Sequence, residues 1–260
     1  MTVSRRAIPH LFEHWDLVAA RIRASRRVVV FLDFDGTLVR IARRPHRVHL
    51  APRTRRILMR LAKNPRVTLA IISGRRRTEL QRYIGMRKIH CLGLYGWERN
   101  APPPLPRPAL KALRLARIAL EEHLSDYPKI WIENKILSLS VHLLAASRDD
   151  EREVRRQVRS WLLPFRQDLR CFENLRDVDI LPRSIAGKGD TVLHVLATQK
   201  LRRALPIYFG DDLSDEPAFA AVRGGISVLV GAPRVTNAKF LLHDPAEVAV
   251  ALSKLEAALA

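Results

Sequence analysis

Two carboxylates stand two residues apart in the segment Asp33-Phe34-Asp35-Gly36-Thr37. The apolar, β-branched run at 27–32 just before them predicts a strand buried on both faces. Asp33 and Asp35 therefore leave the carboxyl end of this strand toward the same side, and Gly36 lets the backbone turn away. Carboxylates this close repel one another unless a cation or a shared proton lies between them. The segment is a candidate cation site, although in a surface turn it would be a solvated or capping pair.

Two further segments carry groups that could bind a phosphate. Ser73-Gly74-Arg75 follows a second apolar run at 67–72 and offers a hydroxyl, a backbone amide and a guanidinium. Lys188 lies between two glycines at the start of a predicted helix, where backbone amides already favour an anion. Taken alone, these segments would be a helix N-cap and a solvent-exposed lysine.

A fourth segment, Gly210-Asp211-Asp212-Leu213-Ser214-Asp215, places three carboxylates after another predicted strand. Hard carboxylate oxygens suit Mg²⁺. All four segments fall at the carboxyl end of a strand or at the start of a helix, where ligands of open α/β sheets gather. Together they indicate a phosphate and magnesium site rather than a series of capped turns.

The elements that must position these residues alternate between buried strands and helices. Such alternation predicts a parallel α/β sheet. The expected strands are 27–32, 67–72, 89–94, 206–210 and 226–230, and the expected helices begin at Pro52 or span 76–84, 188–199, 215–222 and 245–259.

A different pattern interrupts this alternation after a proline-rich stretch at 101–106, which can sustain neither a helix nor an interior strand. The expected elements there are a helix at 108–124, strands at 129–133 and 136–142, a helix at 149–163, and strands at 170–172 and 178–181. We therefore predict an α/β fold with a Rossmann-like parallel-sheet core, residues 1–101 and 183–260, and an inserted α+β domain, residues 102–182. A length of 260 residues fits two such units.

The chain is strongly basic, with 46 Lys and Arg against 26 Asp and Glu and a formal charge of +20. Such a charge could attract nucleic acid or steer a phosphorylated metabolite. The arginines are spread along the whole chain, which favours solvated helix faces over a dedicated nucleic-acid site. Without a zinc-finger spacing or a basic stripe interleaved with aromatics, specific recognition of nucleic acid is not expected.

Cysteine usage and hydropathy bear on the compartment. Cys91 and Cys171 are far apart in apolar, strand-like contexts, which favours buried free thiols and a reducing compartment. The basic N-terminal segment lacks an apolar signal core, and no run is long enough to cross a bilayer. These features predict a cytoplasmic protein with no membrane partner.

The order of the four motifs resembles the haloacid dehalogenase superfamily of phosphatases, and within it the trehalose-6-phosphate phosphatases. The resemblance in the core rests on residues 31–38, Ile72-Ser73-Gly74-Arg75, the pair Gly96 and Glu98, and residues 210–219. In the inserted region, Trp131-Ile132-Glu133-Asn134-Lys135 and the following Ser138-Leu139-Ser140-Val141-His142 are similar to the strand pair with which that family's cap domain binds the sugar.

The resemblance implies a role for each motif. Asp33 would be the nucleophile that forms an aspartyl-phosphate, and Asp35 the general acid and base. Mg²⁺ would be held by Asp33, the backbone carbonyl of Asp35, and Asp211. The phosphate would be bound by Ser73, Gly74 and Lys188, the sugar by Glu133 and Lys135 of the cap, and Thr37, Arg75, Asp212 and Asp215 would support these groups.

Four positions depart from the family pattern, namely Tyr95, Leu143, Asp179 and Leu181. Losing hydrogen-bond partners for a substrate costs discrimination more than it costs chemistry. The expected activity is hydrolysis of a small sugar phosphate, with trehalose 6-phosphate as the first candidate and another sugar phosphate as an open alternative. A catalytically weak scaffold that binds nucleic acid through its basic surface is the second alternative, and phosphoryl transfer within a sugar is a third.

Overall fold

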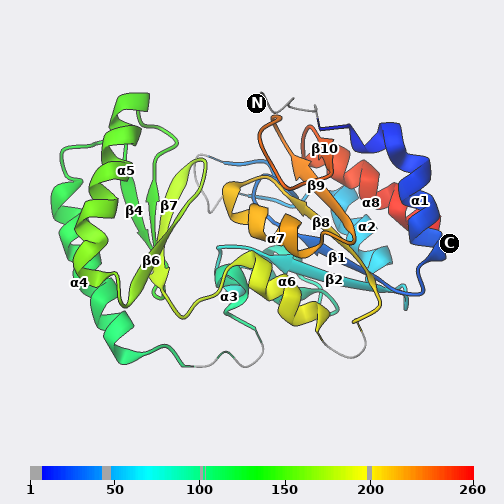
Figure 1. The fold of residues 1–260 in the computed structure, drawn as a ribbon, viewed down its shortest axis with the longest axis horizontal. Coiled ribbons are helices and arrows are strands. Elements are labelled where there is room, and N and C mark those ends of the chain that lie inside the picture. Colours follow the sequence, from blue (N-terminus) through cyan, green and yellow to red (C-terminus); the bar gives the residue numbers. More distant parts are fainter. Residues whose placement is uncertain (1–7, 43–47, 100–101, 103, 198–200) are drawn as a thin grey trace, which may run out of the picture. The chain divides into compact units, whose positions relative to one another are not determined.

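The computed structural model describes residues 8–42, 48–99, 102, 104–197 and 201–260 (Figure 1). The chain divides into two compact units, which we call the core unit, residues 1–99 with 187–260, and the inserted unit, residues 100–186. The first predicted boundary, at residue 101, lies outside the described residues. The second, at residue 182, coincides with the end of a strand, whereas the division falls at Gly187, directly before a helix.

The core unit contains a six-stranded sheet in the order β10-β9-β8-β1-β2-β3. Its strands are β1 (Val28–Leu32), β2 (Val67–Ile72), β3 (His90–Leu92), β8 (Leu205–Gly210), β9 (Ile226–Val230) and β10 (Phe240–Leu242). All neighbouring strands run parallel, and Val28 at the start of β1 pairs with Val67 on one side and Leu205 on the other. The carboxyl ends of β1, β2 and β8 therefore lie at the same edge of the sheet.

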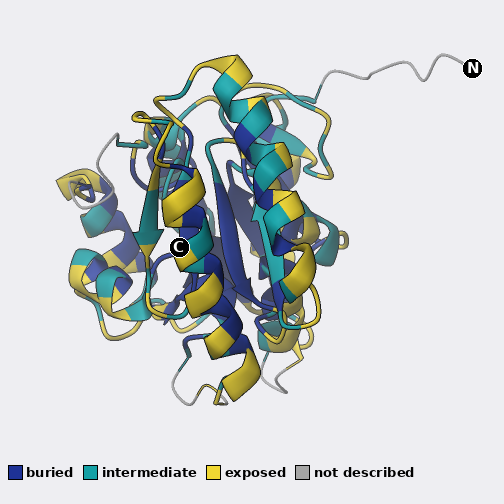
Figure 2. Ribbon diagram, turned by 90° about the vertical axis from the view of Figure 1, so that its left-hand side faces the viewer, coloured by how far each residue is buried: buried dark blue, intermediate teal, exposed yellow. Residues whose placement is uncertain are grey.

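Helices cover both faces of this sheet. They are α1 (Trp15–Ala24), α2 (Pro52–Leu61), α3 (Arg77–Ile84), α6 (Lys188–Leu196), α7 (Glu216–Ala221) and α8 (Pro245–Leu259), with short 3-10 turns η1 (Leu11–His14), η3 (Leu94–Gly96) and η5 (Leu213–Asp215). Val28, Val30 and Leu32 pack in a core with α1, α2, α3 and α8, while Val29 and Phe31 pack with α6 and α7. Figure 2 shows the buried strands between helices whose outer surfaces are exposed. Burial on both faces explains why the core strands read as unbroken apolar runs.

The inserted unit is an antiparallel sheet in the order β4-β5-β7-β6. Its elements are α4 (Arg107–His123), β4 (Trp131–Asn134), β5 (Leu139–His142), α5 (Arg148–Leu162), η4 (Leu163–Phe165), β6 (Leu169–Glu173) and β7 (Asp177–Pro182). Alternate residues such as Val141, Val178 and Ile180 pack in one core with α4 and α5. The residues between them, including Ser140 and Asp179, point to the opposite face of the sheet.

The structure confirms the predicted fold class, and several elements differ in extent. The predicted strand 136–142 begins only at Leu139, because Ile136 has a φ of +71° and forms a turn with Asn134. The predicted strand 89–94 ends at Leu92 and gives way to the turn η3. The short strand β10 was not predicted, and the predicted helix end at Gln199 lies outside the described residues.

Two smaller expectations concern the cysteines and the membrane. Cys91 is buried, Cys171 is half-buried, and both are free thiols. Burial raises the pKa of Cys91 to about 11 and that of Cys171 to about 12, so neither is a ready nucleophile. Among the described residues, every helix is too short or too polar to span a bilayer.

Candidate active site

The first predicted motif lies at the carboxyl edge of the core sheet. Asp33 follows β1, is 5% exposed, and its backbone N–H donates to the carbonyl of Phe209 on β8 at 2.9 Å. This pairing continues the sheet and brings the end of β1 beside the end of β8, which leads to Asp211. Gly36 has a φ of +85°, and a Cβ atom there would lie 2.0 Å from Oδ2 of Asp211. Only glycine both adopts this turn and leaves room for the second carboxylate.

Lys188 connects this edge to the first turn of α6. Its Nζ donates to Oδ1 of Asp33 and to Oδ1 of Asp215, both at 2.8 Å, and the residue is 3% exposed. The lysine is therefore a buried cation between two carboxylates, and the solvent-exposed alternative is wrong.

Asp215 is fully buried, and its hydrogen bonds occupy both oxygens. Oδ1 accepts from Lys188 and from the hydroxyl of Tyr208 at 2.7 Å, and Oδ2 accepts from the backbone N–H groups of Asp211 and Asp212 at 3.1 and 2.9 Å. Such a carboxylate is fixed in place and orients Lys188 as well as the loop after β8. Sequence reasoning did not find Tyr208, although a hydroxyl within an otherwise apolar strand was an available signal.

The electrostatics of this cluster follow from its burial. Burial raises the pKa of Asp33 to about 7; Lys188 opposes the rise and Asp215 adds to it. Burial also raises the pKa of Asp211 well above its ordinary value, with Asp33 and Asp215 contributing. Burial alone would lower the pKa of Lys188, but Asp215 and Asp33 raise it overall, so the ammonium stays charged.

The cluster has the donor set of a divalent cation site. Carboxylate oxygens of Asp33, Asp211 and Asp215 lie within 4.8 Å of one another. When all three carboxylates are ionised, Lys188 supplies only one positive charge against them, and a divalent cation would offset the remaining negative charge. Hard oxygen ligands of this kind fit Mg²⁺. Asp215 already accepts two hydrogen bonds on each carboxylate oxygen, which makes it a poor candidate for a metal ligand.

The side chain of Asp35 is held by Arg75 rather than by this cluster. Nε and Nη2 of Arg75 donate to the two carboxylate oxygens of Asp35 at 2.6 and 2.8 Å. Arg75 is 7% exposed, and its guanidinium lies 5.6 Å from the ring centroid of Phe34 and 5.4 Å from that of Tyr83. Bidentate pairing and these ring contacts fix the direction of the Asp35 carboxylate.

The Ser73 segment lies at the end of β2, at the same edge of the sheet. Ser73 is buried, and its hydroxyl accepts the backbone N–H of Arg75 at 3.2 Å, while Gly74 follows in a bend. The carbonyl of Ser73 accepts the N–H of Tyr95 at 2.9 Å, and the carbonyl of Tyr95 accepts Oγ1 of Thr191 on α6 at 2.7 Å. Tyr95 therefore links the Ser73 loop to the helix that carries Lys188, a role not predicted for Tyr95 or Thr191.

Thr37 and Asp212 were both predicted to support the site, and their surroundings differ from one another. Thr37 is fully buried, and its Oγ1 has no hydrogen-bond partner among the described residues. Asp212 caps η5, where its carboxylate accepts the N–H of Leu213 at 2.6 Å. Arg234 donates to the carbonyls of Asp211 and Asp212 at 2.7 and 2.8 Å and so fixes this loop from outside. No motif around Arg234 pointed to this contact.

In the inserted unit, Glu133 and Lys135 take part in a polar cluster on the face of the sheet opposite α4 and α5. Nζ of Lys135 lies 3.9 Å from Oε2 of Glu133 and 3.5 Å from Oδ1 of Asp179. Glu133 is directly across from Ser140 on β5, and Ser140 is directly across from Asp179 on β7. Three strands thus place two carboxylates and an ammonium side by side.

Further polar groups hold this cluster. Asp179 accepts from the Ser140 hydroxyl and from Nδ2 of Asn174, the latter at 3.2 Å. Nε2 of His142 lies 3.0 Å from Oε2 of Glu133, and the His142 ring stacks on Trp131 with centroids 3.9 Å apart. An aromatic ring beside paired charges is typical of a surface that binds a polar ligand with an apolar face.

Three of the four positions that depart from the family pattern, 143, 179 and 181, lie in the inserted unit. Leu143 is buried in the core of the inserted unit. Asp179 still contributes a carboxylate to the polar cluster. Leu181 is buried, but Arg170 is directly across from it on β6, so a cation is present on this face one strand away.

Comparison with known proteins identifies the family. The family model described as trehalose-phosphatase matches residues 31–244. A trehalose-phosphate phosphatase of Mycobacterium tuberculosis is 33% identical over 239 residues, which cover 86% of this chain and 60% of the relative. One of Mycobacterium avium is 33% identical over 246 residues, 87% of this chain and 61% of the relative. The chain thus spans about 60% of the length of these relatives.

A solved structure extends the match to the fold. The C-terminal domain of a trehalose-6-phosphate phosphatase from C. albicans superposes with a TM-score of 0.85, covering 98% of this chain and 99% of that one, at 21% identity. At this identity the match shows the fold, and the family model and the mycobacterial relatives show the kinship that the motifs indicated. The chain belongs to the trehalose-phosphatase family.

Proposed function

We propose that this chain is a phosphatase that hydrolyses trehalose 6-phosphate to trehalose and phosphate. The observation that carries the proposal is the buried cluster in which Lys188 joins Asp33 to Asp215 beside Asp211. Phosphoryl transfer through a covalent intermediate requires a nucleophilic carboxylate, a cation and a second carboxylate. This cluster brings them together at one edge of the sheet. The trehalose-phosphatase family and its named relatives support the substrate.

The first chemical step uses Asp33 and Asp35. A carboxylate oxygen of Asp33 attacks phosphorus, the bond between phosphorus and the sugar oxygen breaks, and that oxygen takes a proton from Asp35. In the second step Asp35 takes a proton from water, whose oxygen attacks the phosphorus of the aspartyl-phosphate. The bond to Asp33 then breaks, which releases phosphate and restores both carboxyl groups.

Asp33 must be ionised to attack, yet burial favours its protonated form. Lys188 opposes this tendency through its hydrogen bond of 2.8 Å. Mg²⁺, held by Asp33, Asp211 and the backbone carbonyl of Asp35, would when bound supply positive charge that offsets the repulsion between the nucleophile and the phosphate. Ser73 and Gly74, at the end of the neighbouring strand, would bind the phosphate oxygens.

Arg75 would set the direction of the Asp35 carboxyl group. Its two hydrogen bonds, at 2.6 and 2.8 Å, use one site on each oxygen of Asp35. The remaining sites on these oxygens can face the sugar oxygen in the first step and water in the second.

The inserted unit would select the sugar. Glu133, Lys135 and Asp179 offer acceptors and a donor for sugar hydroxyls, and sites built to hydrogen-bond a substrate discriminate strongly against analogues that lack the partner. Arg170 would supply positive charge on this face beside Leu181.

The test is phosphate release by the purified chain with Mg²⁺ from a panel of trehalose 6-phosphate, sucrose 6-phosphate, glucose 6-phosphate and mannose 6-phosphate. We expect kcat/KM for trehalose 6-phosphate to exceed the others by about tenfold or more. A preference for another sugar phosphate would overturn the substrate, and release from none of them would overturn the phosphatase itself.

A further inference from the structure

The two edges of the core sheet differ in their charged groups, because carboxylates and cations such as Lys188 and Arg75 are paired at the carboxyl edge, whereas the amino edge, where the strands begin, has basic groups alone. The carboxyl edge holds the acidic cluster of Asp33, Asp211 and Asp215. The five segments that lead into β1, β2, β3, β8 and β9 at the amino edge each contain one to three Lys or Arg and no Asp or Glu. These segments are residues 25–27, 62–66, 85–89, 197–204 and 222–225.

Nine basic side chains at this amino edge are exposed. None of the nine forms an ion pair within the described part of the chain. They are Arg23, at the end of α1, and Arg26, Arg27, Lys63, Arg87, Lys88, Arg202, Arg203 and Arg223. Some arginines elsewhere in the chain, such as Arg75, Arg155 and Arg234, do contact a carboxylate. We call these nine residues the basic edge.

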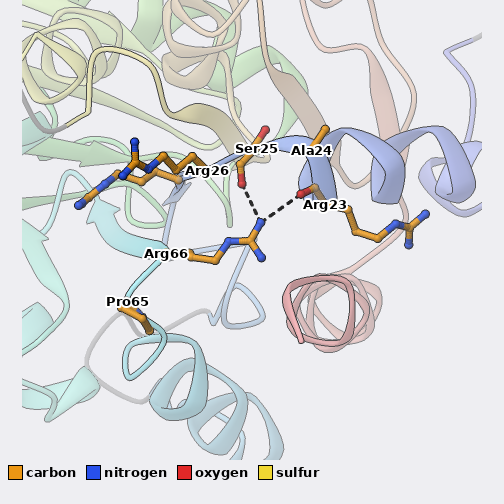
Figure 3. Close-up of a pocket in the computed structure, with 7 residues that line it drawn as sticks. Arg23, Ala24, Ser25, Arg26, Pro65 and Arg66 are labelled. Atoms are coloured by element: carbon orange, nitrogen blue, oxygen red, sulfur yellow. Dashed lines mark hydrogen bonds between the residues drawn. The ribbon is translucent and has the colours of Figure 1, made fainter.

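A pocket of about 410 Å³ opens within the basic edge, lined by residues 23–27 with Pro65 and Arg66. Figure 3 shows the guanidinium of Arg66 between the backbone of Arg23 and that of Ser25, whose carbonyls it contacts at 3.2 and 2.7 Å. The side chains of Arg23 and Arg26 extend from the pocket on opposite sides. Arg66 thus fixes the backbone of a loop that presents three further arginines to solvent.

Helix dipoles explain only part of this arrangement. The segments follow the C-terminal ends of helices, where a cation gains about 0.3–1 kcal/mol. This gain, and the matching cost of an anion at the same place, accounts for the sign of these charges, but it does not account for two or more exposed cations in one segment. Unpaired like charges repel one another, so the arrangement is better explained by an anionic partner.

We propose that the basic edge binds a linear polyanion with closely spaced phosphate groups, such as a nucleic-acid backbone or inorganic polyphosphate. Five neighbouring strands spaced about 4.8 Å apart give the edge a length of about 19 Å, more than a single phosphate needs. One DNA strand presents about six phosphates over that length. The five segments contain no Phe, Tyr or Trp, so bases have no stacking surface and binding is independent of base sequence.

This site is separate from the catalytic one. Residues 27 and 33 flank β1, and six residues of extended chain span about 20 Å. The basic edge therefore works whether or not the proposed phosphatase activity is correct, and variants there leave the catalytic groups in place.

The test measures binding of a short labelled DNA duplex by fluorescence anisotropy from low to physiological salt, with long-chain polyphosphate as competitor. The test variant is Arg23→Gln with Arg26→Gln and Arg27→Gln. The control, Arg152→Gln with Arg156→Gln and Arg159→Gln on α5, removes the same charge from arginines that are ion-paired.

We expect the test variant to bind at least about tenfold more weakly and to reduce the slope of log K against log salt by about 2–3, with the control within about twofold of wild type. Displacement by polyphosphate would support recognition of the phosphate chain alone, and the affinities at physiological salt would identify the better ligand. Equal losses in both variants, no binding of duplex or polyphosphate, or binding only to anionic lipid vesicles would overturn the proposal. Unchanged thermal unfolding of both variants would show that they fold.

Discussion

In the core unit, charged side chains meet at the ends of parallel strands, whereas in the inserted unit they stand on the face of an antiparallel sheet. Lys188 contacts two carboxylates at 2.8 Å, and Asp215 is held by four donors. Lys135 lies 3.5 and 3.9 Å from its carboxylates. Tight contacts fix groups for one reaction, while looser pairs can exchange partners with a ligand. The difference suggests that the core unit determines the chemistry and the inserted unit determines which sugar is accepted.

The largest effect should come from Asp33→Asn in the core unit. Removing the nucleophile should lower kcat by about 10³-fold or more for every sugar phosphate alike. The fold should persist, because asparagine has nearly the same shape and relieves repulsion with Asp211. Phosphate release and thermal unfolding check the two parts, and turnover near wild type would refute Asp33 as the nucleophile.

The next effect concerns stability without metal. The pKa of Asp33 is raised to about 7 in the folded state, so between about pH 4 and 7 the folded protein holds a proton that the unfolded chain has lost. Wild type should therefore lose stability relative to Asp33→Asn as the pH rises through this window, by roughly 2–4 kcal/mol.

Thermal unfolding of both proteins in EDTA at pH 5 and pH 8 measures this difference. Comparing wild type with Asp33→Asn at each pH cancels the effect of the large net charge, because pH changes the other charged groups equally in both proteins. Mg²⁺ should raise the Tm of wild type more at pH 8 than at pH 5, because it competes with protons for carboxylates. A difference between the two proteins that is independent of pH would contradict a buried, proton-binding Asp33.

In the inserted unit, Lys135→Met should change selectivity rather than chemistry. We expect kcat/KM for trehalose 6-phosphate to fall about 10- to 100-fold, mainly through KM, because buried carboxylates and sugar hydroxyls lose a donor. Lys129→Met is a matched control, since Lys129 is an exposed lysine of the same unit. A fall in kcat alone, or an equal effect at Lys129, would contradict the division of labour between the units.

The smallest effect should come from Tyr208→Phe. This change removes one of four hydrogen bonds to Asp215, at 2.7 Å, and should lower the free energy of unfolding by about 1–2 kcal/mol. Because three donors still hold Asp215, kcat should fall by less than about fivefold. Denaturant unfolding and steady-state kinetics measure the two quantities, and a loss of activity as large as that of Asp33→Asn would mean that Tyr208 does more than hold Asp215.

The sequence predicts best where one physical pattern acts alone. The strand Val67–Ile72 and the helix Pro245–Leu259 have their predicted bounds, because an unbroken apolar run and an N-terminal proline mark them clearly. The strand Phe240–Leu242 was missed because three residues carry no usable periodicity. The start of β5 was misplaced because Ile136, a strand former by type, occupies a turn with positive φ.

The sequence predicted the motifs of the candidate site but not the contacts between their side chains. Asp33 and Asp211 follow neighbouring parallel strands and Lys188 begins a helix beside them, so the topology of the core brings the three together. The bidentate pair of Arg75 with Asp35 and the hydroxyl of Tyr208 on Asp215 depend on side-chain directions across neighbouring strands. Periodicity along one strand does not contain that information.

The concentration of unpaired basic side chains at one end of the core sheet also makes the charge of this unit uneven from end to end. On a sulfonate support or a mica surface, Arg26, Arg27 and their neighbours should face the solid, while the edge with Asp33 points to the solution. Simple adsorption at low salt would then orient the molecules uniformly. A protein that aligns in this way needs no tag to be immobilised in one orientation.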